Sequence, residues 1–128
     1  MGMKKICFLI DDDEDDQDIF KIAVKRSNLN IECITASGGF EALKLLNNDP
    51  NFKPDYIFLD LNMPGMDGRQ TLKEIKKLQH LPDSKVIMYS TSSYEGDIKE
   101  TKNMGAHAFV SKPSNVADLV KILTVTIL

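Results

Sequence analysis

The sequence predicts an α/β domain built on a doubly wound, five-stranded parallel sheet. Five short runs rich in Ile, Val, Phe and Leu recur along the chain, and such runs are typical of strands buried on both faces of a parallel sheet. Between them lie longer segments with helical periodicity, such as Leu72, Ile75 and Leu78 on one face. Strands that alternate with helices of about 10–15 residues indicate βαβ crossovers, which cover both sides of a sheet.

The order of elements along the chain is βαβαβαβαβα. We expect the strands at Lys5–Ile10, Ile31–Thr35, Tyr56–Leu59, Val86–Tyr89 and Ala108–Val110. Asp15 and Asp16 suit the first turn of the first helix, where the helix dipole favours acids. Gly38-Gly39 leads into the second helix, and Gly105 fits the position after the end of the fourth. The last helix is expected from Asn115 to about Ile127.

Length and composition favour one globular domain over residues 1–128. We interpret Met1-Gly2 as a cloning remnant and expect no further domain in this chain, whether it is a stand-alone protein or a piece of a longer one. The net charge is −3 and the pI about 5.3, which argues against a nucleic-acid or anionic-membrane binder. No stretch approaches the roughly 20 apolar residues of a membrane span. Cys7 and Cys33 lie in strand-like runs, and we interpret them as buried thiols of a protein in the reducing cytoplasm.

Polar side chains stand where the expected strands end. Asp11-Asp12 follows the first strand, Asp60 the third, Ser90-Thr91 the fourth and Lys112-Pro113 the fifth. Ligands of doubly wound sheets bind at the edge formed by the carboxyl ends of the strands. Clustered carboxylates raise one another's pKa unless a cation neutralises them, and Mg²⁺ prefers oxygen ligands of this kind. The sequence therefore predicts a magnesium site at this edge.

Four motifs carry a resemblance to a known family. They are FLIDDD at residues 8–13, FLDLNMPGMDG at 58–68, VIMYSTSS at 86–93 and AFVSKP at 108–113. Together they resemble the receiver domain of two-component response regulators over essentially the whole chain. The resemblance implies a flavodoxin-like (βα)5 fold with strand order 2-1-3-4-5. It also implies a signalling switch that catalyses only its own phosphorylation and dephosphorylation.

The same resemblance assigns roles at the site. Asp60 is the phosphoacceptor, whose carboxylate forms an aspartyl phosphate. Asp11, Asp12, Asp60 and the backbone carbonyl of Asn62 hold Mg²⁺, for which Mn²⁺ can substitute. Lys112 pairs with a phosphoryl oxygen. The phosphoryl donor is expected to be a histidine kinase or a phosphotransfer protein.

Switching is also implied by the resemblance. Ser90 moves toward the phosphoryl group and hydrogen-bonds one of its oxygens. Phe109 then turns into the space that Ser90 has vacated. A downstream protein is expected to bind the surface formed by the fourth helix, fifth strand and fifth helix, and the chain to be a monomer or a weak homodimer. Members of the family often have a cis bond at the position of Lys112-Pro113.

The acidic run leaves alternatives open. Asp12-Asp13 is an alternative to Asp11-Asp12 as the metal pair; we prefer the latter because Ile10 is the last apolar residue of the strand. The remaining acids exceed what one metal needs, and we interpret them as a solvated helix start. They are Asp13, Glu14, Asp15, Asp16 and Asp18.

Three alternative functions fit the sequence less well. A phosphatase of the haloacid dehalogenase type needs Asp-x-Asp, whereas Asp60-Leu61-Asn62 has asparagine second. A flavodoxin-like cofactor binder needs a phosphate-binding loop where this chain has six acids. A receiver that has lost its chemistry and acts as a binding module would not be expected to keep every key residue.

The expected fourth helix carries mixed signals. Ser92-x-x-Glu95 matches a capping box, which favours a helix start. Gly96 follows in the first turn, where glycine costs about 0.5–1 kcal/mol. We hypothesise that the start of this helix is mobile and tunes switching.

Overall fold

The computed structural model describes residues 4–81 and 83–127 and alternates strands with helices throughout. The elements are β1 (Lys5–Ile10), α1 (Glu14–Ser27), β2 (Ile31–Ala36), α2 (Gly39–Asn48), β3 (Tyr56–Leu59), α3 (Gly68–Lys76), β4 (Lys85–Ser90), α4 (Glu95–Asn103), β5 (Ala108–Ser111) and α5 (Val116–Thr126). The strands pair in parallel in the order β2-β1-β3-β4-β5, which confirms the predicted fold class and strand order. The expected remnant at Met1-Gly2 lies outside the described residues.

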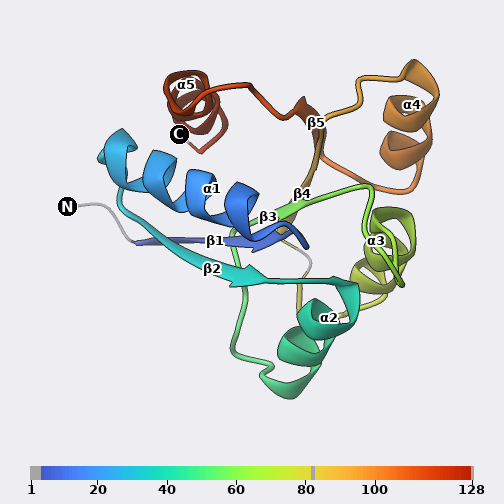
Figure 1. Cartoon of the computed structure of the whole chain (residues 1–128). Coiled ribbons are helices and arrows are strands. Elements are labelled where there is room, and N and C mark those ends of the chain that lie inside the picture. Colours follow the sequence, from blue (N-terminus) through green and yellow to red (C-terminus); the bar gives the residue numbers. More distant parts are fainter. Residues whose placement is uncertain (1–3, 82, 128) are drawn as a thin grey trace.

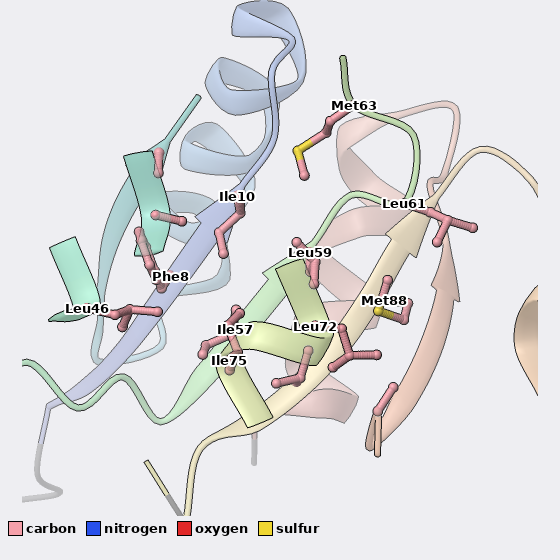
Figure 2. Packing of buried hydrophobic residues seen from close by; sticks show 14 of the residues in the cluster. Phe8, Ile10, Leu46, Ile57, Leu59, Leu61, Met63, Leu72, Ile75 and Met88 are labelled. Carbon is pink, nitrogen blue, oxygen red and sulfur yellow. The ribbon is translucent and has the colours of Figure 1, made fainter. Parts of the chain in front are cut away.

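Two helical layers enclose the sheet: α1 and α5 cover one face, and α2, α3 and α4 the other (Figure 1). Alternate residues of each strand supply the two cores, so Phe8 of β1 faces α2 and α3 while Leu9 faces α1 and α5. Figure 2 shows the first core, in which Leu46 of α2 and Leu72 and Ile75 of α3 pack over the sheet. Burial on both faces explains why the strands are almost continuously apolar.

Side-chain caps fix where three helices begin. Asp13 Oδ1 accepts from the backbone N–H groups of Asp15 (2.9 Å) and Asp16 (3.4 Å) and so begins α1. Asp67 and Gln70 form a reciprocal capping box at α3, and Asn115 caps α5. These caps satisfy backbone donors that the first helical turn leaves free. Asp67-Gly68 is thereby the start of α3.

The end of α4 matches the prediction, but its start differs. Gly105 follows the helix with a φ of +104°, which glycine adopts without strain. The helix begins at Glu95 after Tyr94, which makes no side-chain capping bond, so the predicted capping box is wrong. Ser92 Oγ instead accepts from the N–H of Tyr94 at 3.3 Å. The Ser92 side chain therefore stabilises a local turn instead of capping the helix.

The cysteines lie opposite each other in register on β1 and β2, and both are free. Cys7 is buried as expected, whereas Cys33 is only half-buried. Burial raises the pKa of Cys33 to about 11, so its sulfur is a thiol at neutral pH. Among the described helices, none is both long and apolar enough to cross a lipid bilayer.

Candidate functional site

The parallel sheet brings the predicted site residues to one edge. Asp11 follows β1 and its N–H donates to Ala36 O at 3.0 Å, while Asp60 follows β3 and donates to Ile10 O at 2.9 Å. Ser90 ends β4, and the N–H of Lys112 after β5 donates to Ser90 O at 2.7 Å. These bonds continue the sheet ladder by one residue, so the backbone positions of the site are set by the sheet itself.

Three carboxylates at this edge could hold a metal ion. Asp11, Asp12 and Asp60 each offer one oxygen, and these oxygens lie within 4.8 Å of one another. Asp11 is fully buried, Asp60 is 6% exposed and Asp12 faces solvent. Asp11 Oδ1 accepts from the N–H of Asp13, but no donor among the described residues is aligned to bond Oδ2. Oδ2 is instead an ion-pair partner of Lys112 Nζ at 2.9 Å, and an oxygen-only set of carboxylates fits a hard divalent cation.

The structure brings Asp11, Asp12 and Asp60 together as possible metal ligands, and not the alternative pair Asp12-Asp13. The side chain of Asp13 caps α1 and lies outside the group of three carboxylates. Asn62 follows Asp60 closely, and its N–H donates to Asp60 Oδ1 at 3.3 Å. The metal contact of the Asn62 carbonyl stays a prediction.

Lys112 reaches into this acidic edge and is almost completely buried. Its Nζ lies 2.8 Å from Asp16 Oδ2, 2.9 Å from Asp11 Oδ2 and 3.5 Å from Asp60 Oδ2. The ammonium also lies 5.3 Å from the ring centroid of Tyr89. Burial lowers the pKa of Lys112, but contacts with Asp16 and Asp11 outweigh it and the net shift is upward. The side chain is therefore a fixed positive charge beside Asp60 at physiological pH.

Asp60 is the carboxyl group whose protonation the site alters most clearly. Burial raises the pKa of Asp60 to about 7, assisted by the charge of Asp11 and opposed by Lys112 and the N–H of Asn62. Without a bound cation, burial and Asp11 together outweigh the lysine. A metal ion at these oxygens would favour the ionised form, because it adds positive charge where Lys112 alone is insufficient.

Ser90 and Phe109 lie on neighbouring strands at the α4 side of the site. Ser90 is fully buried, and its Oγ accepts from the N–H of Ser92 at 3.2 Å. Phe109 is half-buried and lines a hollow of about 210 Å³ together with Ile98 and Thr101 of α4. All described peptide bonds are trans, so the cis bond considered at Lys112-Pro113 is absent.

Sequence reasoning missed two residues of α1 that shape the site. Asp16 was interpreted as part of a solvated helix start, but its carboxylate binds Lys112. Gln17 is buried and donates through Nε2 to Asp11 O at 2.7 Å and to Ser37 Oγ at 3.2 Å. No spacing rule in the sequence signals the contact of Asp16, because Asp12 precedes the Asp13 cap and lies outside α1. Glu14, Asp15 and Asp18 are exposed, in line with the solvated interpretation.

A model of the response regulator receiver domain family matches residues 7–124, and the chain belongs to this family. It is thus a receiver domain of two-component signalling. The response regulator Rcp1 of Synechocystis sp. is 29% identical over 123 residues, covering 93% of this chain and 84% of the relative. A protein-glutamate methylesterase/protein-glutamine glutaminase of Methanococcoides burtonii is 36% identical over 114 residues, covering 84% of this chain but 31% of that longer protein.

Solved structures give the same result. The phosphorylated cyanobacterial phytochrome response regulator RcpA is similar with a TM-score of 0.83 and 33% identity, covering 94% of this chain and 89% of that one. The Mn²⁺-bound form of Rcp1 is similar with a TM-score of 0.79 and 29% identity, covering 93% and 88%. The family and fold predicted from the four sequence motifs are confirmed.

Proposed function

We propose that Asp60 accepts a phosphoryl group and that this reaction switches the domain between two signalling states. The observation that carries the proposal is the position of Asp60 Oδ2, 3.5 Å from Lys112 Nζ and within the group of three carboxylates. An acceptor there has an ammonium on one side and a cation site on the other. Both would neutralise the charge of an incoming phosphoryl group.

The transfer forms one bond and breaks one. A carboxylate oxygen of Asp60 attacks phosphorus and forms an O–P bond, while the P–N bond of a donor phosphohistidine breaks and the imidazole nitrogen leaves with the electron pair, taking up a proton. Ionised Asp60 is the attacking form. Lys112 pairs with an oxygen of the transferred group, and the Ser90 hydroxyl donates a hydrogen bond to another.

The cation is proposed to be Mg²⁺, with Mn²⁺ as a substitute. Asp11, Asp12, Asp60 and the carbonyl of Asn62 would hold it, and when bound it neutralises phosphoryl charge and orients the group for in-line transfer. The donor set supports a hard divalent ion, because every side-chain ligand is a carboxylate. The Mn²⁺-bound form of the similar Rcp1 also supports a divalent cation here.

The donor is proposed to be a histidine kinase or a phosphotransfer protein. The similarity to RcpA, a phytochrome response regulator, supports a kinase. Movement of Ser90 toward the phosphoryl group would let Phe109 turn inward from the hollow beneath α4. The surface formed by α4, β5 and α5 would then change for a downstream protein.

Intact mass after incubation with acetyl phosphate and Mg²⁺ tests this proposal. Wild type should gain one phosphoryl group, Asp60→Asn none, and Asp18→Asn, which removes an exposed charge elsewhere on α1, should behave as wild type. EDTA should abolish the gain. A wild type that binds Mg²⁺ but stays unphosphorylated by both acetyl phosphate and a phosphohistidine donor would contradict the proposal.

A further inference from the structure

The ammonium of Lys112 has three N–H donors and three carboxylates around it. Asp16 and Asp11 are close, at 2.8 and 2.9 Å, while Asp60 is farther at 3.5 Å. One donor is hydrogen-bonded to Asp16 on α1, while Asp11 and Asp60 at the strand ends are ion-pair partners of the ammonium. Lys112 Nζ donates a hydrogen bond to Asp16 Oδ2, although the two residues lie 96 positions apart in the sequence.

Asp16 differs from the other two carboxylates in one respect. Asp11 and Asp60 belong to the group that could hold a metal ion, whereas Asp16 does not. A cation at that group would compete with Lys112 for the charge of Asp11 and Asp60. Asp16 is then the carboxylate near Nζ, within the described part of the chain, whose charge remains available to the lysine.

The backbone around Asp16 is held in place, so its carboxylate is a defined partner. Asp13 Oδ1 accepts from the N–H of Asp16 at 3.4 Å, which fixes the first turn of α1. The next residue, Gln17, is tied to Asp11 O and to Ser37 Oγ. Asp16 itself stays 31% exposed, so its charge is retained at a lower desolvation penalty than that of a fully buried acid.

We propose that Asp16 is the positioning residue of Lys112: it anchors the ammonium when the cation binds and thereby directs a remaining N–H toward the phosphoryl group on Asp60. This role rests on the proposed phosphoacceptor function. Loss of the anchor leaves a four-carbon side chain free to sample other orientations, so the electrostatic contribution of Lys112 to transfer is lost for part of the time.

The test compares Asp16→Asn with Asp16→Glu and with the matched control Asp15→Asn. Asp15 lies in the same first turn and is exposed, so its substitution removes the same charge without touching Lys112. Initial rates of phosphorylation by acetyl phosphate are measured at saturating Mg²⁺, and Mg²⁺ affinity by calorimetry. We expect Asp16→Asn to be about 10-fold slower with its Mg²⁺ Kd within about threefold of wild type. Asp16→Glu should recover part of the rate, and Asp15→Asn should stay within about twofold.

A spectroscopic readout separates positioning from a general loss of structure. In ¹⁵N-lysine NMR, a buried and hydrogen-bonded ammonium gives a slowly exchanging Nζ signal, assigned to Lys112 by its absence in Lys112→Met. The signal should persist in wild type and in Asp15→Asn but be lost in Asp16→Asn at saturating Mg²⁺.

Two results would overturn the role of Asp16 while leaving the acceptor function intact. One is Asp16→Asn with the same rate as Asp15→Asn; the other is a Lys112 signal that survives in Asp16→Asn. A wild type that takes up no phosphoryl group would overturn the acceptor function, and the role of Asp16 with it.

Discussion

Helices α3 and α4 have the same length, nine residues each, but they are held in opposite ways. α3 buries Leu72 and Ile75 completely or almost so, and begins at a reciprocal capping box. α4 buries only Thr101 of its described residues and begins without a side-chain cap. Its sequence, EGDIKETKN, offers one large apolar side chain, Ile98, which is half-buried.

Ion pairs provide part of the stabilisation that α4 does not receive from apolar packing. Arg69 of α3 forms ion pairs with both Asp97 and Glu100 of α4. These side chains are partly exposed, and exposed ion pairs stabilise by about 0–1 kcal/mol each, far less than a buried leucine. α3 is thus packed firmly behind Asp60, and we expect that a smaller change in free energy is enough to move α4.

Truncating one apolar side chain in each helix should give the largest contrast. Leu72→Ala removes a fully buried side chain and should lower the unfolding free energy by about 2–4 kcal/mol, because the tightly packed core cannot close the cavity. Ile98→Ala should cost about 1 kcal/mol or less, since the side chain is already half in water. Urea unfolding measures both. Equal losses would show that α4 is packed as firmly as α3.

The buried carboxyl group of Asp60 should make the free energy of unfolding depend on pH. The pKa of Asp60 is about 7 in the folded state and ordinarily 3.8, so the folded protein binds this proton more tightly. The associated stability is present below about pH 4 and is lost as the pH rises through about 7. In EDTA, Asp60→Asn should therefore be more stable than wild type by on the order of 2–3 kcal/mol at pH 8, with the difference fading toward pH 4. A constant difference across that range, from urea unfolding at each pH, would contradict this.

Adding a methyl group to one glycine in each helix should give effects of opposite sign. A Cβ at Gly68 would lie 2.7 Å from Leu61 Cα and still closer to the carbonyl oxygen of Asp60, and backbone cannot give way there. Gly68→Ala should cost about 1–3 kcal/mol and slow phosphorylation. The three atoms nearest to a Cβ at Gly96 all belong to the ring of Tyr94, which is 69% exposed and can turn aside. Gly96→Ala should gain about 0.5–1 kcal/mol. Unfolding midpoints that move in the same direction would argue against the contrast.

The ion pairs between the helices should have the smallest effect on global stability and a local effect on exchange. Arg69→Gln should lower the unfolding free energy by about 0.5–1 kcal/mol or less, while amides of α4 exchange several-fold faster and those of α3 stay unchanged. Hydrogen exchange with mass spectrometry measures this, with Lys73→Gln on exposed α3 surface as the control. In wild type the first turn of α4 should already exchange faster than α3; exchange as slow as that of α3 would contradict its mobility.

The site could be predicted from the sequence to the extent that the sheet alone determines it. Asp11, Asp60, Ser90 and Lys112 each end or follow a strand, and parallel pairing brings those ends to one edge whatever the side chains do. No comparable rule predicts the contact between Lys112 and Asp16. That contact depends on how α1 is rotated against the sheet, which Asp13 and Gln17 set through bonds that no sequence pattern specifies.

The start of α4 was missed for a local reason. Serine two residues before Tyr94 can either cap a helix or close a turn, and the two uses differ by little free energy. The motif Ser92-x-x-Glu95 fits the first use, while the structure adopts the second. By contrast, Asp67 caps α3 reciprocally with Gln70, and the following Gly68 approaches the backbone of Asp60 and Leu61 closely.

The sparse burial of α4 also bears on how such a domain can evolve. A helix that contributes little to the core can exchange most of its residues without loss of folding, provided that Thr101 and the partners of Arg69 are kept. Under the proposed function, its outward residues would be free to diverge together with a downstream partner. Under the same proposal, the sheet and Asp60 would stay constant while the surface of α4 changes, so new signalling connections could arise by drift on one short helix.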